Sequence, residues 1–109
     1  MAYDEKLVQR VRENLTGQPG LVEKLMFGGV GFLLHGNMAC GVIKEKLIIR
    51  VGPDNYDEAL AQPHTGVFDI TGRPMRGWVM VSSGGYVSEV DLQAWVQRGV
   101  NFALSLPPK

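Results

Sequence analysis

The sequence predicts an α+β domain of two layers, in which helices pack on one five-stranded antiparallel sheet. Two observations predict this class. Between Lys24 and Gly52, apolar residues and glycines form short runs separated by turn signals, which is typical of consecutive strands. Helical periodicity is confined to the two ends of the chain and to one short segment between them. Short connections favour antiparallel pairing, so the predicted order is α-β-β-β-α-β-β-α.

Length and composition set the limits of this interpretation. The 109 residues suffice for a single domain, residues 1–109, whose core needs no disulfide or metal. Eleven Lys and Arg residues balance eleven Asp and Glu residues, so no overall charge favours nucleic acid or an acidic membrane. The single cysteine, Cys40, cannot form an intramolecular disulfide. Neither a signal-peptide pattern nor an apolar run of ~18 residues is present, so we expect a cytoplasmic protein.

The first predicted helix runs from Asp4 to Leu15. Acidic residues in its first turn suit the helix dipole, and glycine and proline within residues 17–20 end it. The apolar residues form a single stripe at helical spacing, namely Leu7, Val8, Val11 and Leu15.

Three strands are expected next, at residues 30–34, 38–43 and 47–51. Gly28 and Gly29 predict a bulge or bend where the first of them begins. Both faces of the first two strands are largely apolar or glycine. We therefore expect helices to cover one side of the sheet and another body, such as a second subunit, to cover the other.

The second half of the chain supplies a short helix, two strands and a long helix. Pro53 suits the first position of the short helix, and strands are expected at 67–70 and 78–81. Ser88 is expected to cap the last helix, and Gly99 within its apolar stripe predicts a close approach to the sheet. That stripe consists of Leu92, Trp95, Val96, Gly99, Phe102, Ala103 and Leu106.

No pattern of residues predicts catalysis, a metal or a cofactor. The glycines at 28–31 precede a strand rather than a helix, which excludes the usual phosphate-binding loops. His35, Cys40 and His64 lack the paired short spacing of zinc ligands. Cys40 lies in an apolar strand, where a buried small side chain is the simpler interpretation than a nucleophile. Catalytic, cofactor-binding and metal-ligating residues are therefore predicted to be none.

The most distinctive polar segment runs from Thr71 to Trp78. Arg73, Met75, Arg76 and Trp78 are of residue types enriched at interaction hot spots, so they are the candidate partner-binding residues. The alternative is an ordinary connection in which the tryptophan enters the core and water solvates the arginines. Direct nucleic-acid binding by the exposed face of the last helix is a weaker possibility, because acids precede its polar residues.

Several segments together resemble the amino-terminal domain of the TfoX/Sxy family. They are the opening YDEKLVQRVRENL, MFGGVGFLLHGNMACGV, LIIRVGPDNYDEAL, TGRPMRGWV and the closing NFALSLPPK. The resemblance spans about Tyr3 to Leu106. It implies a two-layer fold similar to that of type III secretion chaperones. It also implies a bacterial regulatory role, since full-length relatives promote transcription of competence genes with the cyclic-AMP receptor protein. Those relatives carry a C-terminal domain that is not in this sequence.

Three functional hypotheses follow. The first is a non-enzymatic regulatory module that binds a protein partner from the transcription machinery, with a homodimer as a further possibility. The second is a small-molecule-binding domain or enzyme with a pocket between sheet and helices, lined by His35, Cys40 and Tyr56. The third is direct DNA binding, which neutral net charge disfavours.

Overall fold

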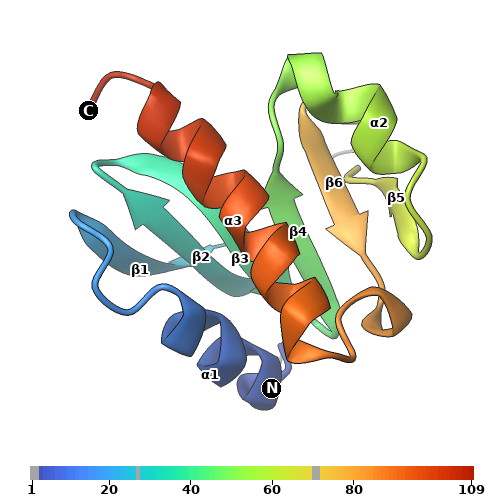
Figure 1. The fold of residues 1–109 in the computed structure, drawn as a ribbon, viewed down its shortest axis with the longest axis horizontal. Coiled ribbons are helices and arrows are strands. Elements are labelled where there is room, and N and C mark those ends of the chain that lie inside the picture. The colour runs from blue at the N-terminus through green and yellow to red at the C-terminus, as the bar shows by residue number, and fades with distance from the viewer. Residues whose placement is uncertain (1–2, 27, 70–71) are drawn as a thin grey trace.

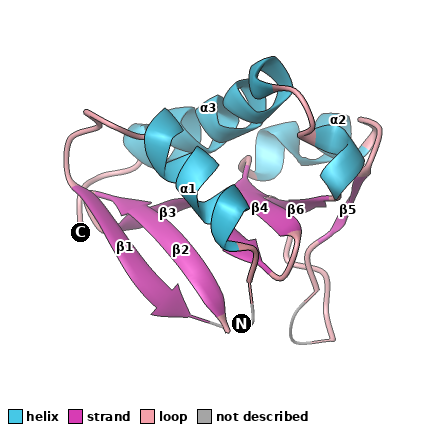
Figure 2. Ribbon diagram, turned by 90° about the horizontal axis from the view of Figure 1, so that it is seen from below, coloured by secondary structure: helices cyan, strands magenta, loops and turns pink. Residues whose placement is uncertain are grey.

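The computed structural model describes residues 3–26, 28–69 and 72–109. Within these ranges the chain forms a six-stranded antiparallel sheet, and three α-helices cover one of its faces (Figure 2). The strand order is β1-β2-β3-β4-β6-β5. In Figure 1, α3 crosses the sheet between α1 and α2. The predicted α+β class with helices packed on an antiparallel sheet is confirmed, and the strand count differs by one.

The elements follow one another with short connections. The helices are α1 (Glu5–Asn14), α2 (Tyr56–Leu60) and α3 (Glu89–Ser105). The strands are β1 (Leu21–Met26), β2 (Gly29–Leu34), β3 (Asn37–Ile43), β4 (Lys46–Arg50), β5 (Thr65–Val67) and β6 (Trp78–Val81). Single 3-10 turns, Pro53–Asn55 and Ser83–Gly85, precede α2 and α3.

The additional strand is β1, which pairs with β2 along its whole length. The glycines at 28 and 29 predicted a bulge or bend, and they lie where the chain turns from β1 into β2, with Met26 paired with Gly29. Because β1 is an edge strand, its four central residues are exposed and show no alternation of apolar and polar side chains. A strand without this alternation cannot be recognised from the sequence pattern.

Local side-chain chemistry fixes the two longer helices. The Asp4 carboxylate accepts hydrogen bonds from the N–H groups of Lys6 and Leu7, which caps α1. The Ser88 hydroxyl accepts one from the N–H of Asp91 at the start of α3. The predicted Ser88 cap and the predicted apolar stripes therefore agree with the structure, whereas Asp4, expected within the first turn, is the N-cap of α1. The stripe of α1 is fully buried at Leu7, Val8, Val11 and Leu15.

Gly99 brings α3 against the sheet. A Cβ atom on this residue would lie 2.2 Å from the backbone oxygen of Ala39 in β3, so only glycine fits the observed separation. Ala39 is the extra residue where the β2–β3 register shifts, since Phe32 pairs with Cys40 and Leu33 with Met38. The predicted close approach of Gly99 is confirmed.

One predicted strand is shifted along the chain. The expected strand at 67–70 is β5 at Thr65–Val67, and Ile70 lies outside the described residues. Phe68 follows the strand and is buried on the sheet face opposite the helices. The Thr65 hydroxyl donates to carbonyl groups at the end of α2, which starts the strand early. The prediction of the β5 range from apolar residues was therefore wrong by about two residues.

Candidate partner-binding surface

The sheet face turned away from the helices carries a second apolar cluster. Ile48 and Phe68 are buried, yet neither belongs to the core beneath the helices. Leu47 and Ile49, which flank Ile48, do belong to that core, as expected for side chains that alternate between faces. We call the sheet face turned away from the helices the open sheet face. Its residues are Met26, Leu33, Met38, Ile48, Arg50, Phe68, Met75, Trp78 and Met80.

Methionine and glycine shape the open sheet face. Four of the five methionines of the chain belong to it. Gly31 and Gly41 are paired across β2 and β3. A Cβ atom on Gly31 would lie 2.8 Å from the sulfur of Met26, and one on Gly41 would lie 2.9 Å from Cε of Met38. The glycines thus leave room for two methionine side chains to lie across the sheet. Methionine is flexible and polarisable, and such surfaces adapt to varied partners.

A cavity of about 330 Å³ opens on this face. Its apolar walls include Met38, Phe68, Met75 and Trp78. The rings of Phe68 and Trp78 are 6.0 Å apart at an interplanar angle of 43°, an ordinary aromatic pair. Apolar walls of this kind suit the insertion of a partner's bulky side chain.

Two charged residues line this cavity, Arg50 and the C-terminal Lys109, and Arg50 is the one that lies against its aromatic wall. Its guanidinium carbon lies 5.2 Å from the ring centroid of Trp78 and 5.2 Å from that of Phe102. Such cation–π contacts hold the guanidinium in place. None of the ion pairs among the described residues involves Arg50. The cavity therefore combines an apolar interior with a cation that has its carboxylate-binding capacity free.

The structure separates the four residues singled out in the sequence. Met75 and Trp78 line the cavity, whereas Arg73 is exposed in the preceding loop. The guanidinium carbon of Arg76 lies 5.5 Å from the ring centroid of Tyr56, outside the cavity. The role of all four in partner binding stays a prediction, and Thr71 lies outside the described residues.

Backbone hydrogen bonds direct this loop onto the sheet. The Met75 N–H donates to the carbonyl of Phe68 at 2.9 Å, and the Trp78 N–H donates to the carbonyl of Met75 at 3.1 Å. Trp78 is half-buried on the open sheet face and does not belong to the core beneath the helices. The alternative interpretation placed the tryptophan in the core and the arginines in water, and Arg73 and Arg76 are indeed exposed.

Sequence reasoning missed six of the eight residues that line the cavity, among them Met38, Arg50 and Phe68. Arg50 is the one charged side chain at the end of the apolar run Leu47–Val51, which was a signal that the strand ends at a polar site. Met38 and Phe68 carried no such signal, because only the strand register brings them together.

The proposed pocket residues of the second hypothesis lie in three different places. Cys40 is fully buried, and burial raises the pKa of its thiol to about 12, so it is not a nucleophile at neutral pH. Tyr56 is buried at the start of α2, and His35 is exposed at the β2–β3 turn. Among the described residues, no three His, Cys, Asp or Glu side chains are grouped to hold a metal ion.

Three polar side chains of α3 are engaged with one another or with α2. Arg98 donates hydrogen bonds of 2.8 and 3.0 Å to the two carboxylate oxygens of Glu58, and Gln97 donates to Asn101. These contacts leave fewer donors for nucleic acid, and nothing in the geometry favours the third hypothesis. Length and hydropathy rule out a membrane crossing for every helix in the described ranges.

A family model matches most of this chain. The sequence model of the family described as TfoX N-terminal domain matches residues 13–103. The matched range includes β1 to β6 and most of α3, and therefore the whole open sheet face. No curated protein matches the chain.

Proposed function

Because the chain belongs to the TfoX N-terminal domain family, we propose that it is a non-enzymatic regulatory module that binds a protein partner through the open sheet face. The family supports a regulatory or interaction domain in general, and it is not known as a family of enzymes. A partner from the bacterial transcription machinery, and a role in competence, are the finer parts of the proposal. They rest on the resemblance of this sequence to the amino-terminal domain of competence regulators.

One observation carries the proposal: a cavity with apolar walls and an unpaired cation on the face that the helices leave open. Partner binding concentrates energy in a few anchors that fill such pockets, and it uses arginine and aromatic residues preferentially. Arg50, Met75 and Trp78 meet that description within a single cavity. A bulky partner side chain would enter between them, and a neighbouring carboxylate would pair with Arg50.

The test is capture of the partner by a tagged chain from a nuclease-treated lysate of the source organism, followed by mass spectrometry. Two variants test whether the partner binds at the cavity. Met75→Glu places a charge in the cavity and should abolish recovery of the partner. Val87→Glu is the matched control, since Val87 is 75% exposed and lies outside the open sheet face. Recovery that survives Met75→Glu, or that is lost equally with Val87→Glu, would contradict the proposal, provided that both variants melt as the wild type does.

A small ligand in the same cavity is the second candidate function. The volume of about 330 Å³ lies at the lower end of the range for ligand pockets, and Arg50 would pair with a carboxylate or phosphate. A thermal-shift screen of anionic metabolites distinguishes the two candidates. A shift that Arg50→Gln removes would favour the ligand.

A further inference from the structure

The sheet ends in two edge strands of unequal length. The strand β5 has three residues, whereas β1 has six. In an antiparallel ladder, every second residue of an edge strand turns its N–H and C=O groups away from the sheet. The strand β1 also presents apolar side chains to water, since Leu25 is 77% exposed and Val22 is 49% exposed. An edge of this length and character is a template for a further strand.

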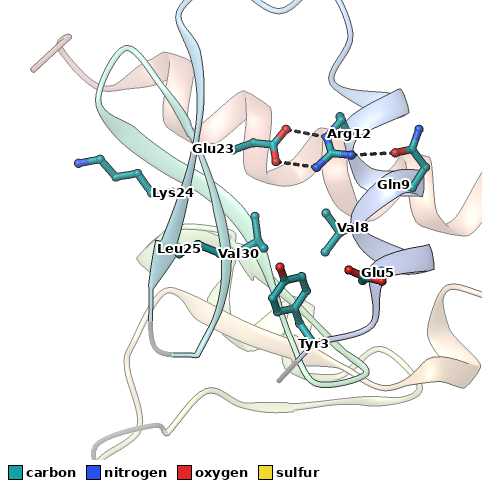
Figure 3. A pocket seen from close by; sticks show the side chains of 9 residues that line it. All are labelled: Tyr3, Glu5, Val8, Gln9, Arg12, Glu23, Lys24, Leu25 and Val30. Carbon is teal, nitrogen blue, oxygen red and sulfur yellow. Dashed lines mark hydrogen bonds and ion pairs between the residues drawn. The ribbon is translucent and has the colours of Figure 1, made fainter. Parts of the chain in front are cut away.

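A cavity of about 310 Å³ lies beside this edge, between β1 and α1 (Figure 3). Val8 of α1 and Val30 of β2 form its apolar floor, and Leu25 stands at its mouth. At one end, Arg12 donates hydrogen bonds of 2.7 and 2.9 Å to the two carboxylate oxygens of Glu23. A side chain from a strand added to β1 on the helix side would reach into this cavity across Leu25.

The polar rim of the cavity carries a carboxylate, Glu5, that lies outside the ion pairs of the described residues. The hydrogen bond from Arg12 lowers the pKa of Glu23, so both members of that pair are charged and neutralise each other. Glu5 also lines the cavity, on the α1 side near Tyr3. Lys24 also lines the cavity, and Figure 3 shows its side chain extending away from Glu5, so the two do not form an ion pair.

We propose that β1 accepts an extended segment of another protein as a seventh strand, with a Lys or Arg side chain of that segment in the cavity. Its aliphatic stem would lie on Val8 and Val30, and its cation would meet Glu5 and the Tyr3 hydroxyl. A second copy of β1 does not fit this description. Its side chains on the helix face are Leu21, Glu23 and Leu25, none of which is basic. The β1 edge adjoins the open sheet face at Met26, but the cavity on its helix side shares no residue with the cavity of the open sheet face, so the two proposals are tested independently.

The experiment uses a blocked seven-residue peptide of alternating Thr and Val with Arg at its centre, titrated into the ¹⁵N-labelled chain and followed by NMR. Shift changes are expected in the amides of β1 and of the first turn of α1. Glu5→Gln should weaken binding by about two- to five-fold, as for one partly exposed ion pair. Glu13→Gln is the matched control, because Glu13 is exposed on the same helix and does not line the cavity. Binding by that variant should equal wild type.

Two altered peptides separate backbone pairing from charge. Replacing the central Arg by Glu should weaken binding, and N-methylation of alternate residues should abolish it, because the ladder hydrogen bonds are lost. The proposal is overturned if the Arg peptide does not bind at millimolar concentration, if the methylated peptide binds equally well, or if the shifts fall outside β1 and α1. Dimerisation of the chain through β1 without any peptide would also overturn it.

Discussion

The replacement Gly99→Ala sets two physical effects against each other at the contact between α3 and β3. In an isolated helix, alanine would stabilise by about 1 kcal/mol relative to glycine. In this structure, the added Cβ atom would lie 2.2 Å from the backbone oxygen and 3.0 Å from the carbonyl carbon of Ala39. Because these are backbone atoms in the middle of a sheet, no side-chain rotation relieves the contact.

The contact outweighs the gain in helix propensity. Ordinary contacts begin at 3.4 Å, so the helix and the strand must separate by about 1 Å. A separation of this size forfeits up to half of the dispersion energy of the facing atoms. Overpacking in cores costs about 1–3 kcal/mol, and a contact this short with backbone atoms belongs at the upper end, about 2–3 kcal/mol, from which the gain of about 1 kcal/mol in helix propensity is subtracted. We therefore expect a net loss of about 1–2 kcal/mol in the free energy of unfolding. For a chain of this length that lowers Tm by roughly 4–16 °C.

The assay is urea unfolding followed by circular dichroism, with calorimetric Tm as a second readout. Gln93→Ala is the control, because Gln93 is exposed on the same helix and its replacement should change stability by less than about 0.5 kcal/mol. A Gly99→Ala chain that is as stable as wild type, or more stable, would refute the reasoning. It would mean that α3 does not lie as close to β3 as the structure has it.

Two further predictions concern titrating groups. Burial raises the pKa of Cys40 to about 12, so a thiol reagent at pH 8 should label it only after unfolding; labelling of the native chain at the rate of a free thiol would contradict this. The hydrogen bond from Arg12 lowers the pKa of Glu23, so the stability that this pair contributes is present above the unfolded pKa of about 4.3 and is lost as pH falls below it. The Tm difference between wild type and Glu23→Gln should therefore shrink between pH 7 and pH 3, and a constant difference would exclude a native role for the pair.

The helices could be predicted from sequence because their signals are local. Asp4, Ser88 and the apolar stripes act within a few residues of the helix that they define. The central strands were predicted for the same reason, from short apolar runs bounded by turn signals. The strand β1 was not predicted, since an exposed edge needs no apolar face and its pairing with β2 is a matter of tertiary contact.

Only part of the candidate site could be predicted from the sequence. Composition pointed to Met75 and Trp78, and both line the cavity. Arg50 and Met38 join them only because the chain folds β3, β4 and β6 into neighbouring positions with a particular register. The apolar character of the second sheet face was expected from its glycine and apolar residues. What covers that face, a partner or a second subunit, stays a prediction.

The affinity of the purified captured partner for the wild-type chain and for Arg50→Gln tests the central claim most directly. Isothermal titration would be made beside Lys6→Gln, an exposed control on α1. The proposal predicts that Arg50→Gln binds about tenfold more weakly or worse, as for loss of one member of an interfacial charge pair, and that Lys6→Gln binds as wild type. Equal affinities for wild type and Arg50→Gln, with both chains folded, would contradict partner binding at the open sheet face.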